Sequence, residues 1–407
     1  MNESNPFSEG SPKNSVSNPE ISNSAKEVPT VQNDFILPSD PKIPDSAEQP
    51  LPPETQKEPT TQTTFEDPIS IASLVAAQRL SYEEMRDTRR CASHSSFLVL
   101  ISICLMNLLI LGFTWLCRSN PALHSNNSSF FYLKPIIYYS ISCFSYCVAI
   151  GFPALLYQLH THEPLEKVVR FDSPKSHGLS RSAIICMFFA GMGLTLLANY
   201  PTSFVTQILQ MFGISHVSPD DMPITSDAAT QIFYMLYGTL IPPLVEELLF
   251  RGVILNILRR HGDSFAIIMS AFIFGLYHGN IPQFVFAFLI GLIAGYLYIR
   301  TGSILISILI HMFNNGFSCL SVLIEQWYGN TAFENFQSAY FVAFLLLGAI
   351  GIGFLIKNRK KYLPLPKSKT LHAPLSVRMT CGIGNLGTIF LILNFIALCA
   401  EIGRAHV

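Results

Sequence analysis

The stretch PLVEELLFRG at residues 243–252 places two adjacent carboxylates and an arginine inside an apolar run at 232–258. Ionisable side chains at membrane depth are costly, so they are retained mainly where they have a partner or a function. Residues four apart lie on one face of a helix, and Glu247 can therefore pair with Arg251. Consecutive helical residues point about 100° apart, which leaves Glu246 to face elsewhere. A buried glutamate that faces a polar cavity suits general-base work on a water molecule.

Apolar residues dominate the whole chain. Of its 407 residues 49% are hydrophobic and 13% are charged, whereas soluble globular proteins carry about 25% charged residues. The mean hydropathy is +0.37, which predicts an integral membrane protein that has the lipid bilayer as its surroundings. A net charge of −1 gives no general attraction for nucleic acid, so we expect no nucleic-acid partner. The nine cysteines include no CxxC pair and are predicted to act as small apolar side chains.

A series of apolar runs begins at residue 96, and a membrane-spanning helix needs roughly 20 such residues. They predict an all-α membrane protein, a polytopic bundle of about 8–9 transmembrane helices. We expect spans at about 96–117, 133–158, 182–200, 229–258, 264–280, 283–300, 303–325, 338–357 and 382–400. Pro242 and Pro243 interrupt the fourth run, so we expect a break there and a fresh helix just before the glutamates.

The composition divides the chain into four parts. Residues 1–90 are rich in Pro, Ser, Glu and Asn and are predicted to form a disordered tail, because they cannot bury enough apolar surface to fold. Within this tail only Ile69 to Arg86, after Asp67-Pro68, hints at a helix. Residues 91–181 carry two N-terminal transmembrane helices and a basic loop. Residues 182–357 form the core that holds the charged motif, and 358–407 contain a second basic loop and a final hydrophobic segment.

The last seven residues, 401–407, are interpreted as a sequence artefact. The codons GAG ATC GGA AGA GCA CAC GTC encode them, and apart from its first base this string matches a common sequencing-library adapter. We expect the natural chain to continue differently after residue 400, which a genomic read across codon 401 checks.

Lysine and arginine concentrate in alternate loops between the predicted spans. The strongly basic loops precede the first span and follow the second, fourth, sixth and eighth. Because cytoplasmic loops carry the excess of basic residues, these loops all lie on one side if the N-terminus is cytoplasmic. We therefore expect a multi-pass protein with a cytoplasmic N-terminus.

Two later apolar runs each carry one histidine. His278 lies near the end of the run at 264–280, and His311 is four residues before Asn315, on the same face of a predicted helix. We expect these three side chains to meet Glu246 in one polar cavity. Small residues at the spacing that permits close helix contact occur in nearby runs: Gly275 and Gly279, Gly291 and Gly295.

Three motifs thus follow one another on hydrophobic segments: Glu246-Glu247-x-x-x-Arg251, Phe274-x-x-x-His278 and His311-x-x-x-Asn315. This arrangement resembles the CPBP family, the CAAX proteases and bacteriocin-processing enzymes that are also called the Abi family. The resemblance covers about residues 182–325. It implies an all-helical membrane bundle that hydrolyses a peptide bond within or near the bilayer.

The resemblance also implies catalytic roles. Glu246 would be the general base and, with His278, would hold and activate the attacking water. His311 and Asn315 would stabilise the oxyanion of the tetrahedral intermediate, as positioned donors do in other hydrolases. The substrate would be a membrane protein or a lipidated peptide, such as a prenylated CAAX protein or a bacteriocin leader.

Glu247 and Arg251 are implied only as supporting residues. The family has also been called metalloproteases, because glutamate and histidine are zinc ligands as well. A water activated by glutamate needs no metal, so no metal and no other cofactor is favoured. The alternative is a zinc ion held by Glu246, His278 and His311.

Two further hypotheses remain open for the function. The chain could be a non-catalytic membrane scaffold with the same fold, although it retains every motif residue. It could instead be a polytopic transporter in which the charged residues relay protons, although no internal repeat is visible and the polar residues cluster in three helices.

Overall fold

The structure, a computed structural model, describes residues 68–118, 120, 123, 133–161, 177–214, 226–366 and 371–404. All the secondary-structure elements in that part of the chain are helices, which confirms the predicted all-α class. Residues 1–67 of the expected tail lie outside the described part, as do the side chains of the suspected artefact at 401–407.

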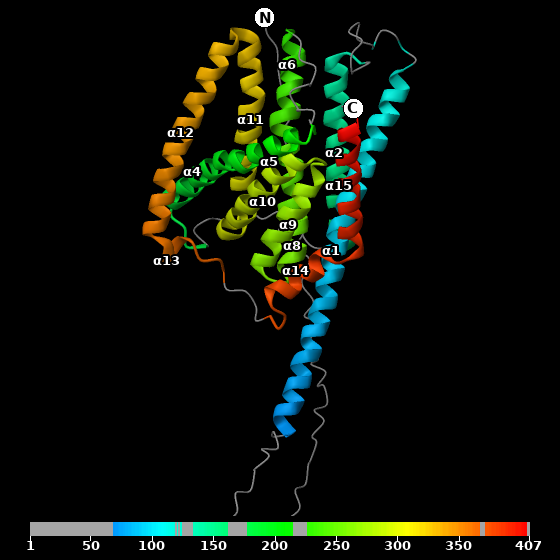
Figure 1. Cartoon of the computed structure of the whole chain (residues 1–407), viewed down its shortest axis with the longest axis vertical. Coiled ribbons are helices and arrows are strands. Elements are labelled where there is room, and N and C mark those ends of the chain that lie inside the picture. The colour runs from blue at the N-terminus through cyan, green and yellow to red at the C-terminus, as the bar shows by residue number, and fades with distance from the viewer. Residues whose placement is uncertain are drawn as a thin grey trace, which may run out of the picture. The chain divides into compact units, whose positions relative to one another are not determined.

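Helices cover nearly all of the described chain (Figure 1). The longer ones are α1 (Pro68–Cys117), α2 (Pro135–Thr161), α4 (Arg181–Leu197), α5 (Asn199–Met211), α9 (Asp263–Tyr277), α10 (Ile281–Thr301), α11 (Leu305–Tyr328), α12 (Asn330–Lys357) and α15 (Leu386–Arg404). Two shorter helices follow α12, namely α13 (Arg359–Tyr362) and α14 (Leu375–Ile383).

Six segments are long and apolar enough to cross a membrane: α1, α2, α4 with α5, α10, α11 and α12. A seventh is formed by α14 and α15 if this pair, bent by 61°, is one span. The protein is therefore an integral, multi-pass membrane protein. The number of spanning segments is lower than the eight or nine expected. One reason is that α9 has only 15 residues, and the other is that the run expected at 229–258 is divided into short helices.

That divided run contains the glutamates. It consists of α6 (Ala228–Met235), the π-helical turn η4 (Leu236–Leu240), α7 (Ile241–Glu247), a second π-helical turn η5 (Leu248–Ile254) and α8 (Leu255–Arg259). A proline cannot donate a backbone hydrogen bond and clashes with the preceding turn. The expected break accordingly falls just before Pro242, in η4, and α7 is the fresh helix that carries both glutamates. Such π-helical turns are frequent at functional sites.

Helices α9 and α10 pack closely because their contact is lined by glycine. A Cβ atom on Gly291 would lie 2.9 Å from the Cα atom of Ala271, and one on Gly275 would lie 2.8 Å from the Phe284 ring. Gly279 has a different role from the one its spacing predicts. Its φ of +72° belongs to the turn between the two helices, a conformation that glycine adopts without strain.

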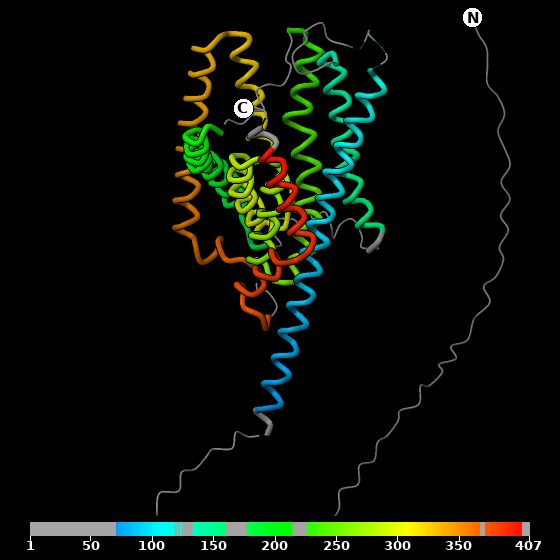
Figure 2. Tube along the Cα trace, turned by 45° about the vertical axis from the view of Figure 1, so that its right-hand side comes forward, coloured from blue at the N-terminus to red at the C-terminus, as the bar shows by residue number. Residues whose placement is uncertain are grey.

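Helix α1 begins at Pro68, so residues 68–90, expected within the tail, are helical instead. This part of α1 gains contacts that its composition does not reveal. The Glu84 carboxylate accepts hydrogen bonds from the backbone N–H groups of His372 (2.8 Å) and Ala373 (3.2 Å), just before α14. Further along, α1 packs against α2, α14 and α15, and α15 lies beside it in both views (Figures 1 and 2).

Basic loops from distant parts of the chain meet at one end of the bundle. The Arg300 guanidinium, at the end of α10, donates to three backbone carbonyls: Tyr362 (2.6 Å), Lys361 (3.0 Å) and His177 (3.0 Å). These bonds tie the C-terminal end of α10 to α13 and to the segment before α4. The link between α11 and α12 lies at the opposite end of α12 (Figure 1).

Candidate active site

A buried ion pair forms the base of the site. Glu247 and Arg251 are 0% and 1% exposed, and Arg251 Nη1 lies 2.8 Å from Glu247 Oε1. The pair expected from the spacing of four residues is therefore present. The Arg251 guanidinium also stacks on the ring of Phe274 in α9, with 4.6 Å between Cζ and the ring centroid, a cation–π contact that is stronger away from water.

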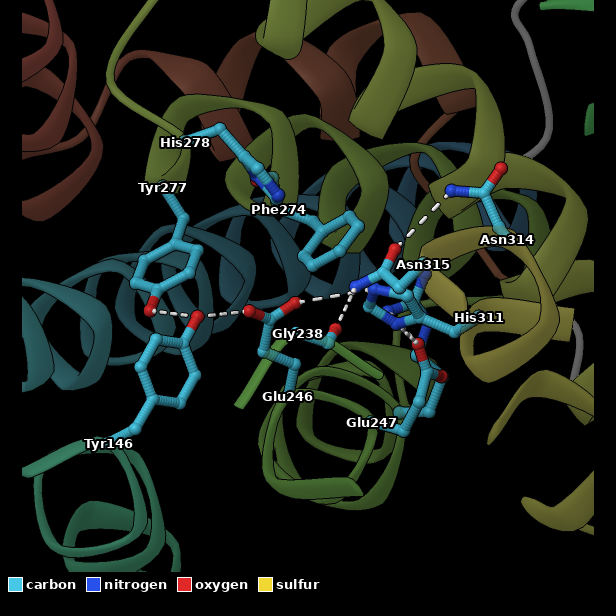
Figure 3. A network of polar contacts seen from close by, with 11 residues as sticks. Tyr146, Gly238, Glu246, Glu247, Phe274, Tyr277, His278, His311, Asn314 and Asn315 are labelled. Carbon is cyan, nitrogen blue, oxygen red and sulfur yellow. Dashed lines mark hydrogen bonds and ion pairs between the residues drawn. The ribbon is translucent and has the colours of Figure 1, made fainter. Parts of the chain in front are cut away.

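His311 lies between the two glutamates (Figure 3). Its Nδ1 atom is 3.0 Å from Glu247 Oε1, and its Nε2 atom is 3.8 Å from Glu246 Oε2. An ionised carboxylate can only accept hydrogen bonds, so we assign the proton of Nδ1 to the bond with Glu247. The Nε2 atom then faces Glu246. Helices α7 and α11 are thus joined through one imidazole ring.

Glu246 has two oxygen atoms in different surroundings. Its Oε1 atom accepts a short hydrogen bond from the Tyr146 hydroxyl group of α2, and the Tyr277 hydroxyl group donates to Tyr146 at 3.0 Å. The Oε2 atom has no hydrogen-bond partner among the described residues. The Glu246 side chain is nevertheless only 3% exposed. One oxygen is therefore held in place while the other remains able to accept a proton.

Tyr146 and Tyr277 were not predicted from the sequence. Tyr277 directly precedes His278, but Tyr146 belongs to a span that carries none of the motifs. An apolar helix with several tyrosines gives no signal for which one will meet a carboxylate 100 positions later. The hydroxyl–hydroxyl–carboxylate chain in Figure 3 depends on how α2 packs against α7.

His278 lies at the end of α9 and turns toward its own helix. Its Nδ1 atom is 2.8 Å from the Phe274 carbonyl oxygen. The Phe274 ring packs edge-on against both histidines, with centroid distances of 4.8 Å to His278 and 5.9 Å to His311. Among the described residues no hydrogen bond joins His278 to Glu246. The ring nitrogen paired with this carboxylate at 3.8 Å belongs to His311.

Asn315 lies one helical turn after His311 on α11. Its amide nitrogen donates to the carbonyl oxygen of Gly238 in the π-helical turn η4 at 3.3 Å, and its amide oxygen accepts from Asn314 at 3.3 Å. The structure gathers the predicted side chains in one region, where both histidines contact the Phe274 ring and Asn315 follows His311 by one turn. The catalytic roles of these residues remain predictions.

The ligand set that the sequence offered for zinc is not arranged as a metal site. Among the described residues, one group of three His, Cys, Asp or Glu side chains has ligand atoms within 4.8 Å of one another, and it is Asp87, Cys91 and His261. Glu246, His278 and His311 do not form such a group. We therefore derive no step of the reaction through a metal at these three residues.

Residues 228–317 match the family described as type II CAAX prenyl endopeptidase Rce1-like, a segment that runs from α6 into α11. The chain is 26% identical over 199 residues to the membrane-embedded CAAX protease MroQ of Staphylococcus aureus (strain USA300). The aligned segment covers 47% of this chain and 76% of MroQ.

A second relative is the putative membrane peptidase YdiL of Bacillus subtilis (strain 168). It is 27% identical over 153 residues, 37% of this chain and 60% of YdiL, so the chain spans less than two thirds of that relative. No solved structure matches the chain significantly.

Replacing Arg251 tests how far the site depends on the buried pair. Arg251→Met leaves the Glu247 carboxylate buried without its counter-charge, and breaking such a pair costs about 3–5 kcal/mol. We expect the free energy of unfolding, measured in detergent, to fall by that amount. The double variant Glu247→Gln/Arg251→Met, in which no charge is left unpaired, should recover part of the loss.

The matched control is the exposed pair Arg79–Glu83, which has the same spacing and an N···O distance of 3.2 Å. Arg79→Met should change stability by less than about 1 kcal/mol, because exposed pairs contribute little. An Arg251→Met protein as stable as the wild type would contradict this account of the site.

Proposed function

Because the chain belongs to the CPBP family of membrane proteases, we propose that it is an endopeptidase in which Glu246 activates the water that attacks a peptide bond. The observation that carries this proposal is the state of the buried Glu246 carboxylate. Its Oε1 atom is held by Tyr146, and its Oε2 atom has no hydrogen-bond partner among the described residues. A general base needs such a free, positioned oxygen within reach of the proton that it takes.

The distance between Glu246 and His311 leaves a place for the water. With Oε2 and Nε2 3.8 Å apart, one water oxygen can lie about 2.8 Å from both atoms. Glu246 would take a proton from this water as the oxygen attacks the carbonyl carbon. The protonated Glu246 would then give the proton to the nitrogen of the leaving peptide, and the carboxylate is regenerated.

The other polar side chains of the site would stabilise the negative charge that develops during the attack, or hold the catalytic groups in place. Asn315 holds Gly238 by a long bond of 3.3 Å, and its amide nitrogen is proposed to donate instead to the oxyanion of the tetrahedral intermediate. His311 would share this role in the form in which its Nε2 atom also carries a proton, because only an N–H group can donate to the oxyanion. Positioned donors of this kind lower the barrier where negative charge forms. His278 has the water-holding role only if it leaves the Phe274 carbonyl when substrate binds. Glu247 and Arg251 would keep His311 in place.

The surroundings of the site suit an apolar substrate. A groove of about 420 Å³ lies between α6, η4 and α11, next to the turn that carries Gly238, and is lined by Ala228, Gln231, Ile232, Met235, Leu236, Thr239, Leu240, Leu323 and Trp327. We propose that the substrate is a membrane protein or a lipidated peptide. The name of MroQ and the Rce1-like match both favour a CAAX-type substrate.

Glu246→Gln tests the proposed base directly. It keeps the shape of the side chain and the acceptor for Tyr146 but removes the basic carboxylate. Because general-base catalysis contributes about 10²–10⁴-fold, we expect cleavage to fall by at least 100-fold. The measurement is a comparison of N- and C-terminal peptides in membranes from cells that carry the wild type or the variant.

The exposed Glu325 offers a control, and Glu325→Gln should leave the peptide pattern unchanged. If Glu246→Gln inserted normally and gave the same termini as the wild type, the protease proposal would fail. Partner binding that survived Glu246→Gln without any cleavage would favour a scaffold, and solute uptake that depended on Glu246 would favour a transporter.

Tyr146 is proposed to be a positioning residue for Glu246. Tyr146→Phe removes a hydrogen bond to a charged group, a loss of about 1.5–3 kcal/mol. We expect kcat to fall by about 10- to 100-fold. KM should stay unchanged, because the binding of the substrate does not involve the hydrogen bond between Tyr146 and Glu246. Tyr277→Phe acts only through Tyr146 and should have a smaller effect. The exposed Tyr328 is the control, and a Tyr146→Phe enzyme with wild-type kcat would contradict the role.

We propose that the N-terminus faces the cytoplasm. The arginine and lysine residues that meet around Arg300 and α13 would then lie on the cytoplasmic side, as basic loops prefer. An epitope tag inserted at Gly329, between α11 and α12, should be accessible to protease outside intact cells, whereas a tag after Pro366 should be protected. The opposite pattern would reverse the topology.

A further inference from the structure

A second polar cluster lies away from the glutamates, where α1 meets the link between α8 and α9. Asp87 and Cys91 are four residues apart on α1, and His261 belongs to the link. Cys91 and His261 are 6% and 4% exposed, whereas the Asp87 side chain is 48% exposed. The cluster is therefore closed toward the protein and open to solvent on the side of Asp87.

Hydrogen bonds around His261 determine which of its nitrogens carries a proton. The Thr88 hydroxyl group donates its single hydrogen to the Glu84 carbonyl oxygen at 2.7 Å. The same hydroxyl oxygen lies 3.0 Å from His261 Nδ1, so it must accept there and Nδ1 must donate. In a neutral ring the other nitrogen, Nε2, then has a lone pair and no proton.

The Nε2 atom is directed at a carboxylate. It lies 3.3 Å from Asp87 Oδ2, yet it has no hydrogen-bond partner among the described residues although it is buried. Two electron-pair donors at this distance repel each other unless a proton or a metal ion lies between them.

Cys91 supplies a third ligand atom at the same place. Its Sγ atom is 3.9 Å from Asp87 Oδ1, and the three possible ligand atoms all lie within 4.8 Å of one another. In a tetrahedral zinc site, bond lengths of about 2.0–2.3 Å place the ligand atoms roughly 3.3–3.7 Å apart. The cluster is close to this geometry and needs only small side-chain movements to reach it.

We propose that Asp87, Cys91 and His261 bind a divalent transition metal ion, with zinc as the ion that fits this ligand set. Thiolate, imidazole and carboxylate together suit zinc. The Cys91 thiol would release its proton to solvent as the metal–sulfur bond forms. Thiolate and carboxylate then carry two negative charges, which balance Zn²⁺. A water molecule can complete the coordination from the open side of Asp87.

The surroundings of the cluster support this assignment. A histidine that binds a metal through one nitrogen usually donates from the other to a fixed acceptor, and Thr88 is such an acceptor. Arg378 donates a short hydrogen bond to the backbone carbonyl oxygen of His261, which holds the link in place. Arg260 and Arg378 are positive groups that face the cluster, and Glu84 is a further negative one.

A metal here would connect α1 to the divided run that carries the glutamates. It would fasten the N-terminal half of α1 to the link that follows α8, and α8 ends the divided run that carries the glutamates. The ion would therefore act on the stability of the bundle rather than on the substrate. This role also differs from the prediction that every cysteine serves as a small apolar side chain.

The test uses the full chain, purified in detergent, freed of metal with a chelator and titrated with Zn²⁺ alone. We expect one zinc ion per chain and a higher thermal unfolding midpoint when zinc is bound, because a ligand of the folded state stabilises it. Cobalt in place of zinc should give a thiolate-to-metal charge-transfer band. Cys91→Ser should remove this band and weaken zinc binding by more than about 100-fold, while Thr88→Val should weaken it by about 10- to 100-fold.

Controls separate this site from adventitious binding and from the glutamates. Cys104→Ser and His94→Ala change exposed residues of the same helix and should leave binding intact. Glu246→Gln should also bind one zinc ion. Asp87→Asn changes a half-exposed side chain, so it should fold and yet bind zinc more weakly. The proposal is overturned if the wild type binds no stoichiometric zinc, or if binding survives in both Cys91→Ser and His261→Ala.

Discussion

The ion pair between Glu247 and Arg251 is the interaction on which the site depends. Burying either charge alone costs several kcal/mol, and only a close and well-bonded partner offsets this. Glu247 meets that requirement twice, because its Oε1 atom accepts from Arg251 at 2.8 Å and from His311 at 3.0 Å. Arg251 in turn lies over the Phe274 ring. One carboxylate therefore fixes the relative positions of the divided run, α9 and α11, and it directs His311 toward Glu246.

The backbone of the divided run contributes as much as its side chains. Irregular backbone at membrane depth is tolerated where it is buried in protein, and the two π-helical turns lie on either side of α7. The first of them offers the Gly238 carbonyl oxygen to Asn315. Helix α9 is short and its C-cap is His278. The polar groups therefore meet where interrupted helices pack against two continuous spans, because His311 and Asn315 come from α11 and Tyr146 comes from α2.

Local spacing explains what could be predicted from the sequence and what could not. The pair of Glu247 with Arg251 and the break before Pro242 follow from rules that act within one or two helical turns. The partner of Glu246 does not, because Tyr146 reaches it only through the packing of α2 on α7. The contacts of Glu84 on α1 with the distant segment before α14 are long-range in the same way and could not be read from the sequence. His278 occupies the predicted region, but its bond to the Phe274 carbonyl oxygen could not be foreseen from the motif.

Glu246 is proposed to activate a water molecule for direct attack on the peptide bond. The most direct measurement is cleavage of a CAAX-type peptide by the purified protein in ¹⁸O-labelled water, followed by mass spectrometry of the new C-terminus after a single turnover. We expect one ¹⁸O atom in the product of the wild type and no product from Glu246→Gln above the rate of background hydrolysis. Equal cleavage by Glu246→Gln, with the same label in its product, would contradict it.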